Sequence, residues 1–292
     1  MIMFEGTATA LITPFKNDGS IDEEGLRRLV DFQEENGVTT LVPCGSTGES
    51  ATLSHEEHIR VVSIVRDQAK KAKILAGAGS NSTAEAVYLS KAAADLGVDG
   101  ILSISPYYIK PTQEGIYQHY MSIAESIDIP VIVYNVPGRT GSNITAETTL
   151  RLAQLPGIIG IKEASGNVSQ VGDILAKKPK DFEVMSGDDG LTFPMLAMGC
   201  TGVISVASNC CPNSMTQMVQ LCLKEKYIDA RAIHFKMLPL VRDLFIESNP
   251  IPIKYVMKRL GYGNGKPRLP LTELSPQNRP VLDMDIAMLG LI

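Results

Sequence analysis

The chain has 292 residues, of which 44% are hydrophobic and 20% are charged, and its formal net charge is −5. This length allows a sizeable core, and the mild acidity without any basic run argues against nucleic acid as a partner. We therefore expect an ordinary soluble protein that acts on a small molecule.

Several other classes are disfavoured by what the sequence lacks. The start, Met1–Gly6, shows no charged segment followed by a long apolar stretch, and no later run is long enough to span a bilayer, so we expect a cytoplasmic protein. The five cysteines and four histidines lack metal-site spacing, which predicts reduced, buried thiols and no metal. Without a Gly-x-Gly-x-x-Gly motif or a P-loop, a dinucleotide or nucleoside triphosphate is not expected.

Short apolar runs alternate with amphipathic stretches from the N-terminus to about residue 210, which is typical of repeated βα units. The predicted strands are Thr7–Ile12, Thr40–Pro43, Ile74–Ala76, Gly100–Ser103, Val131–Tyr134, Ile158–Lys162, Phe182–Ser186 and Gly202–Val206. Two intervening helices have clear ends: Asp22 caps Glu23–Asn36, which Gly37 closes, and Ser54 with Glu57 forms a capping box for Ser54–Lys70.

Eight strands with intervening helices predict a closed (β/α)₈ barrel, with a doubly wound sheet as the alternative. Beyond Cys211 and Pro212 the alternation stops and the chain reads as helical. The predicted C-terminal helices are Ser214–Glu225, Asp229–Glu247, Pro252–Leu260 and Ser275–Leu289. We expect a catalytic barrel over residues 1–224 and a C-terminal helical domain over residues 225–292.

In such barrels the chemistry lies at the C-terminal ends of the strands. The residues that fall there are Ser46 and Thr47 after the second strand, Tyr107 and Tyr108 after the fourth, Tyr134 and Lys162 closing the fifth and sixth, and Ser186–Asp189 after the seventh. Polar groups gathered on one rim indicate a catalytic or binding site.

Lys162 is the most informative of these residues, because it closes an apolar run that reads as a strand buried on both faces. Burial lowers the pKa of an amine and so favours attack on a carbonyl. The plainer interpretation is a lysine that reaches past the sheet to water. Two other segments favour the Schiff-base interpretation.

The first segment is Gly45–Ser50, where glycines free the backbone and neighbouring hydroxyls provide hydrogen bonds that suit a carboxylate. In the second segment, Tyr134 ends a strand and Arg139 follows in the next turn. A phenol is a plausible proton relay, and a guanidinium matches a carboxylate in bidentate geometry.

Six segments together resemble the class I, lysine-dependent pyruvate aldolases, the family that includes dihydrodipicolinate synthase and N-acetylneuraminate lyase. The segments begin at Gly45 (GSTGESATL), Ser105 (SPYY), Tyr134 (YNVPGRTG), Gly160 (GIKEASGN), Ser186 (SGDD) and Asn249 (NPIPIK). The resemblance covers essentially the whole chain and is close to the dihydrodipicolinate synthase branch.

The resemblance implies that Lys162 forms an imine with pyruvate, whose enamine attacks L-aspartate 4-semialdehyde to give 4-hydroxy-tetrahydrodipicolinate on the route to diaminopimelate and lysine. It implies that Tyr134 shuttles protons through Ser46 and Thr47 to Tyr108 of a neighbouring subunit, so that a homodimer or a tetramer built from dimers is required. The remaining implied site residues are Thr47 for the pyruvate carboxylate, Arg139 for the semialdehyde carboxylate, and Gly187 and Ile204 for backbone near the lysine. No cofactor is implied, because the imine nitrogen is the electron sink.

Ser46 departs from the two threonines typical of dihydrodipicolinate synthases, since the Ser-Thr pair is closer to N-acetylneuraminate lyase. Arg139 argues against a sugar substrate, although a 2-keto-3-deoxy-sugar-acid aldolase or a hydroxyproline-pathway dehydratase stays open. In a different class, a non-catalytic barrel that binds a keto acid as a regulator needs the arginine but not a reactive amine.

The family also includes lysine-inhibited members with an allosteric pocket at a subunit interface. The matching positions here are Ser50, Ala51, His55, His58, Asn81, Glu85 and Tyr107. Glu85 is expected to pair with the α-amine of L-lysine, Asn81 and Tyr107 to bind its carboxylate, and the histidine face to receive its ε-ammonium. Inhibition by L-lysine is therefore an expectation.

Overall fold

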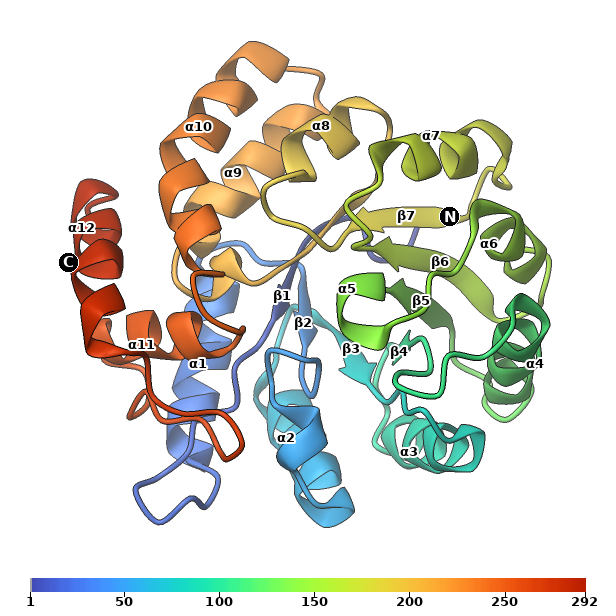
Figure 1. Ribbon diagram of the computed structural model, residues 1–292, viewed down its shortest axis with the longest axis horizontal. Helices are drawn as coiled ribbons and strands as arrows, with labels where there is room; N and C mark the ends of the chain where they lie inside the picture. Colours follow the sequence, from blue (N-terminus) through green and yellow to red (C-terminus); the bar gives the residue numbers. More distant parts are fainter. Residues whose placement is uncertain (1) are drawn as a thin grey trace.

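The computed structural model describes residues 2–292 and shows a closed barrel of eight parallel strands in sequential order, β1 to β8 (Figure 1). The strands are β1 Gly6–Ala10, β2 Thr40–Val42, β3 Lys73–Gly77, β4 Gly100–Ile104, β5 Val131–Asn135, β6 Ile158–Glu163, β7 Glu183–Ser186 and β8 Gly202–Ser205. Since β8 also pairs with β1, the predicted (β/α)₈ barrel is confirmed and the doubly wound sheet is excluded.

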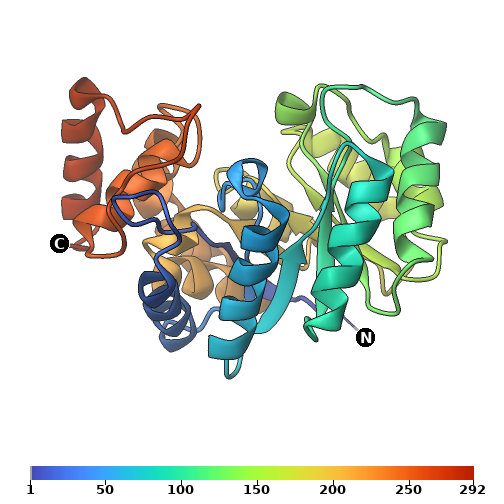
Figure 2. The same cartoon turned by 90° about the horizontal axis from the view of Figure 1, so that it is seen from below.

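Helices surround the barrel and extend beyond it at the C-terminus (Figures 1 and 2). The α-helices are α1 Glu23–Glu35, α2 His55–Gln68, α3 Thr83–Asp95, α4 Gln113–Ala124, α5 Pro137–Thr140, α6 Ala146–Leu152, α7 Val168–Lys177, α8 Thr192–Ala197, α9 Pro212–Leu223, α10 Tyr227–Asp243, α11 Ile251–Arg259 and α12 Arg279–Met288. Three short 3₁₀ helices lie at Ser50–Thr52, Ala207–Asn209 and Pro276–Asn278. No helix within residues 2–292 is long and apolar enough to cross a membrane.

The structure confirms the predicted caps of helices α1 and α2. The Asp22 side chain accepts from the Gly25 amide at the start of α1, and Gly37 follows that helix with a left-handed φ of 81°. Ser54 and Glu57 form the reciprocal capping box at the start of α2. These ends depend on side chains a few residues away, so the local sequence predicts them well.

Each strand contributes side chains to two apolar clusters, because successive side chains of a strand point to opposite faces. One fills the barrel interior and includes Tyr134, Met185 and Ile204. The other, larger cluster lies between the strands and the surrounding helices. The interior of the barrel is therefore packed, and space for a ligand is left at its rim.

Several predicted boundaries were wrong by a few residues. Strands β5 and β6 continue one residue past Tyr134 and Lys162, and β1 ends at Ala10. The helix predicted to end at Glu247 ends four residues earlier and runs through Pro239. Strand and helix ends depend on the pairing of the next element, which local sequence does not encode.

Other differences concern short helices. The turn after β5 contains α5 in addition to the intervening helix α6, and the helix between β7 and β8, α8, has only six residues. The last helix begins at Arg279, after a short 3₁₀ turn, rather than at Ser275. Helices of four to six residues bury little surface and leave no periodic pattern.

The C-terminal helices form an extension on one side of the barrel (Figure 2). Helix α12 packs on α10 and α11, and α11 contacts the 3₁₀ turn that follows β8. The extension therefore reaches the rim from which the site is built.

Candidate active site

A cavity of about 670 Å³ opens at the C-terminal rim of the barrel. Its walls come from the loops after β2 to β5 and from two C-terminal segments. Its lining residues include Ser46, Glu49, Tyr134, Arg139 and Asn249. Of the predicted site residues, Ser46, Tyr134 and Arg139 line this cavity, whereas Lys162 and Thr47 are not among its lining residues, and the C-terminal extension supplies part of its wall.

Lys162 lies on β6 with 5% of its surface exposed. Burial lowers the pKa of Lys162 to about 7, although the Asp189 carboxylate opposes this shift. Its Nζ lies 4.2 Å from the centre of the Tyr134 ring, and it makes no hydrogen bond or ion pair with the described residues. A substantial fraction of such an amine is neutral at pH 7 and can attack a carbonyl.

The residues after β7 and β8 shape the space around this amine. A Cβ at Gly187 would lie 2.9 Å from Cε of Lys162, so only glycine leaves room for the lysine. Ile204 is buried in the barrel interior. Asp189 is also buried, and one of its oxygens accepts from the amides of Val206 and Ala207 at 3.0 and 2.8 Å.

Tyr134 lies on β5 beside the lysine, and its hydroxyl is near that of Ser46. Burial raises the pKa of Tyr134, while the nearby Arg139 charge and the Ser46 contact lower it. The phenol is therefore protonated at neutral pH and near a second hydroxyl, as a proton relay requires.

Thr47 is held by the C-terminal segment. Asn249 Nδ2 donates to Thr47 Oγ1 at 3.0 Å. Because this oxygen accepts from Asn249, the hydroxyl proton of Thr47 is directed to another acceptor. Thr47 is thus set up as a donor, as a carboxylate ligand would need.

Arg139 lies in α5, where Pro137 occupies the first turn. Its Nη2 donates to the Asn249 carbonyl at 3.2 Å. One residue of the C-terminal segment, Asn249, therefore contacts both Thr47 and Arg139, the two residues expected to bind carboxylates.

The structure does not bring Tyr108 to these hydroxyls within one chain. Its side chain is 85% exposed, and its backbone has a left-handed φ of 71° while its amide donates to the Thr140 carbonyl at 3.1 Å. The phenol of Tyr108 is therefore largely exposed rather than packed against its own barrel.

The candidate lysine site shares the same cavity. Lining residues from that set are Ser50, Ala51, His55, His58, Glu85 and Tyr107, whereas Asn81 is not among them.

Its charged groups already have partners. Glu85 accepts from Ser80 and contacts His55 Nε2 at 2.7 Å. His58 Nε2 contacts the Gly77 carbonyl at 2.6 Å, and burial lowers the pKa of His58. His58 is therefore a neutral donor to the backbone, and the contact between His55 and Glu85 is the one between two side chains that a ligand could replace.

Sequence reasoning missed the roles of Asn249, Glu49 and Lys254. Glu49 and Lys254 form a buried ion pair between the loop after β2 and α11. Asn249 and Lys254 belong to the NPIPIK segment, so the motif pointed to this segment without indicating what it contacts. Asp189 stood in the noted Ser186–Asp189 turn, without an assigned role.

Comparison with known proteins identifies the family of the chain. The model of the dihydrodipicolinate synthetase family matches residues 3–288. A 4-hydroxy-tetrahydrodipicolinate synthase from Methanosarcina mazei is 50% identical over 291 residues, covering 99% of this chain and 100% of the relative.

Two solved structures are similar along their whole length. Dihydrodipicolinate synthase from Acinetobacter baumannii, complexed with pyruvate, has 41% identity and a TM-score of 0.98 over 99% of this chain and 100% of the other. The synthase from Cyanidioschyzon merolae, with lysine bound, has 40% identity and a TM-score of 0.97 over 100% of both chains. The chain belongs to the dihydrodipicolinate synthetase family.

Proposed function

We propose that this chain catalyses the 4-hydroxy-tetrahydrodipicolinate synthase reaction, in which pyruvate condenses with L-aspartate 4-semialdehyde. The observation that carries the proposal is Lys162, a buried amine with a pKa of about 7 that lies against Tyr134. Family membership and the name of the Methanosarcina mazei relative support the choice of substrates. The reaction serves the biosynthesis of diaminopimelate and lysine.

The neutral amine of Lys162 attacks the carbonyl carbon of pyruvate, and water leaves as the imine forms. Loss of a methyl proton from the protonated imine gives an enamine, because the imine nitrogen accepts the electron pair. The enamine carbon attacks the aldehyde of the semialdehyde. The amine of that substrate then closes the ring on the imine carbon and displaces Lys162, which regenerates the enzyme.

Tyr134 carries protons between these intermediates, and Ser46 extends the relay, since the two hydroxyls lie near each other. Thr47 donates to the pyruvate carboxylate with the proton that its contact with Asn249 leaves free. Arg139 binds the semialdehyde carboxylate with its guanidinium fork, and its charge does not change during proton transfer. Gly187 and Ile204 complete the wall near Lys162.

Tyr108 enters this scheme from a second copy of the chain. Its exposed phenol and its left-handed backbone support a role outside its own barrel. We therefore include a cytoplasmic homodimer, or a tetramer built from dimers, in the proposal. We also retain the division into a barrel over residues 1–224 and a helical domain over residues 225–292.

Trapping with borohydride tests the imine directly. Pyruvate and borohydride should add a reduced pyruvyl group to Lys162, which peptide mass spectrometry would locate. A non-catalytic barrel that merely binds keto acids would stay unmodified, and that outcome would reject the proposal.

Ser46 departs from the threonine pair of the synthases. The substrates of the other aldolases should therefore be tested as well. Purified protein should be assayed with pyruvate and each aldehyde: aspartate semialdehyde, N-acetylmannosamine and the sugar-acid aldehydes. We expect the semialdehyde to have the highest kcat/KM. A higher kcat/KM for a sugar aldehyde would replace the proposed substrate while keeping the imine.

We also propose that L-lysine inhibits the enzyme from the part of the cavity around His55 and Glu85. The name of the Cyanidioschyzon merolae structure, with lysine bound, supports this extension. Glu85 would pair with the α-amine in place of His55, and Tyr107 adjoins Tyr108, so that binding at the pocket can alter proton transfer.

Titration of initial rate with L-lysine tests this extension. Millimolar lysine should inhibit the native enzyme, and Glu85→Ala should weaken the inhibition strongly. Glu56→Ala is the control, because Glu56 is an exposed carboxylate next to His55 on α2 and is not one of the residues of the proposed site. Undiminished inhibition in Glu85→Ala would reject the site.

A further inference from the structure

The loop from Cys44 to Glu49, which carries Ser46 and Thr47, has an unusual backbone. Both Cys44 and Glu49 adopt left-handed φ angles, 55° and 57°. Such angles cost roughly 1 kcal/mol or more in a residue with a side chain, so the surroundings must hold them in place. For Glu49, contacts with the C-terminal part of the chain provide this support.

Glu49 is held from the C-terminal side of the chain. One carboxylate oxygen accepts from Nζ of Lys254, and the other accepts from the Arg268 amide at 2.8 Å. Glu49 and Lys254 are both nearly inaccessible, and the Lys254 ammonium also lies 4.1 Å from the centre of the Phe15 ring. The end of the loop is therefore attached to α11 and to the segment that follows it.

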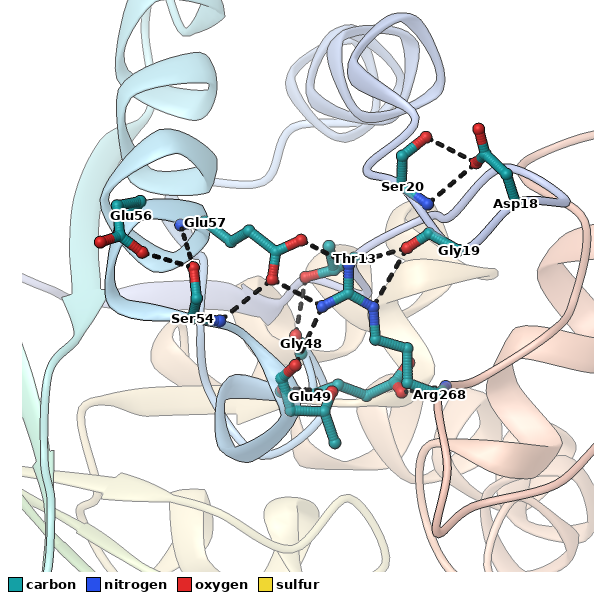
Figure 3. A network of polar contacts seen from close by, with 11 residues as sticks. Thr13, Asp18, Gly19, Ser20, Gly48, Glu49, Ser54, Glu56, Glu57 and Arg268 are labelled. Carbon is teal, nitrogen blue, oxygen red and sulfur yellow. Dashed lines mark hydrogen bonds and ion pairs between the residues drawn. The ribbon is translucent and has the colours of Figure 1, made fainter.

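Arg268 strengthens this attachment. Its guanidinium donates to both carboxylate oxygens of Glu57 and to the Gly19 carbonyl, as Figure 3 shows. It also donates to the Thr52 carbonyl at 2.9 Å. Arg268 thus connects the C-terminal segment to both ends of the short turn between Glu49 and α2.

Stability alone does not explain a buried ion pair. The cost of removing two charges from water usually offsets their attraction, and an apolar pair of similar volume is often as stable. What such a pair provides is a defined relative position of two segments. Here the two segments are the hydroxyl loop and the C-terminal helix that follows Asn249.

Asn249 completes the connection, because it is bonded to Thr47 and Arg139 and lies five residues before Lys254. A shift of α11 would therefore move the end of the hydroxyl loop through Glu49 and would move the partner of Thr47 at the same time.

We propose that Glu49, Lys254 and Asn249 are positioning residues through which the C-terminal helices hold Ser46 and Thr47 in the geometry that pyruvate requires. The inference rests on the proposed function, because it takes pyruvate as the ligand of the hydroxyl loop. It gives the C-terminal extension a direct part in the first half-reaction.

The test uses the double variant Glu49→Gln/Lys254→Met, which removes both charges with little change in volume. We expect it to remain folded, and we expect the pyruvate concentration that half-saturates borohydride trapping to rise about tenfold or more. The KM for the semialdehyde should change less than about threefold, since Arg139 lies in α5 and not on the hydroxyl loop. Arg259→Ala is the control, because Arg259 lies on the same helix and pairs with Asp283; it should trap pyruvate normally.

A folded double variant with native half-saturation would overturn the proposal. If the double variant does not fold, the pyruvate half-saturation of Asn249→Ala tests the proposal instead. This substitution removes the contact to Thr47 without leaving a buried charge. Unchanged pyruvate half-saturation in Asn249→Ala would also overturn it. Absence of trapping in the native enzyme would instead reject the proposed function, so the two failures are distinct.

Discussion

Two lysines of this chain are almost fully buried, and they differ in what surrounds them. Lys162, on β6, has no hydrogen bond or ion pair within residues 2–292, and burial lowers its pKa to about 7. Lys254, on α11, is hydrogen-bonded to the carboxylate of Glu49. Burial also lowers the pKa of Lys254, but the attraction of Glu49 opposes the shift.

The difference shows how one residue type takes two roles. An amine that is buried without a partner loses its proton easily and becomes a nucleophile. An amine that is buried against a carboxylate stays charged and joins two parts of the structure. The reactive lysine therefore costs stability, and the paired lysine fixes the relative position of two segments.

The largest expected effect is on the rate. Lys162→Ala and Lys162→Arg should both reduce turnover by a factor of about 10⁴ or more, since neither side chain can form an imine. Initial rates with protein from a host lacking its own enzyme would measure this. Appreciable turnover by either variant would contradict the role of Lys162 as the nucleophile.

The second effect is on stability and concerns the paired lysine. Lys254→Met should lower the free energy of unfolding by about 3–5 kcal/mol, because Glu49 would be left buried without its cation. The double variant Glu49→Gln/Lys254→Met should recover most of this loss. Urea unfolding measures both, and an equal loss in single and double variants would mean that packing rather than charge is responsible.

Arg139→Ala tests whether Arg139, near the reactive lysine, binds the carboxylate of the semialdehyde. Loss of a bidentate contact should cost about 2–4 kcal/mol in kcat/KM for the semialdehyde, with trapping of pyruvate largely retained. Separate titrations of the two substrates measure this. A collapse of pyruvate binding with an unchanged KM for the semialdehyde would reverse the assignment.

Removing the reactive lysine should have the opposite effect on stability from removing the paired one. The unfolded chain keeps the proton of Lys162 up to its ordinary pKa of 10.5, whereas the folded chain releases it at about 7. Protonation therefore favours the unfolded chain, so Lys162→Met should be more stable than the native protein. The gain should be largest below pH 7 and should disappear as the pH rises towards 10.5, which thermal unfolding across pH would reveal.

The smallest effect concerns Asp189, whose charge opposes the lowering of the Lys162 pKa. In Asp189→Asn the pKa of Lys162 should fall further, because the attraction to its ammonium is lost. The midpoint of the pH dependence of pyruvate trapping with cyanoborohydride should then move to lower pH. A shift to higher pH would show that Asp189 acts mainly through the Val206 and Ala207 amides that it holds.

Much of this molecule was accessible from the sequence. The strand and helix pattern was readable because hydrophobic periodicity and caps are local properties, as the Ser54 and Glu57 capping box shows. Lys162 stood out because it follows an apolar β-branched run. The closed order of the strands then places Ser46, Tyr134 and Lys162 at one rim, since the ends of parallel strands meet at the same edge.

The partners of these residues were decided only by the tertiary structure. Asn249 reaches Thr47 across 202 residues of sequence, and Lys254 reaches Glu49 across 205. No periodicity or spacing links such positions, because their contact depends on how the C-terminal helices pack beside the barrel. The pKa of Lys162 is a tertiary property for the same reason. The local sequence predicts that Lys162 is buried. That no carboxylate within residues 2–292 lies within hydrogen-bonding distance of its amine depends on how the neighbouring strands pack.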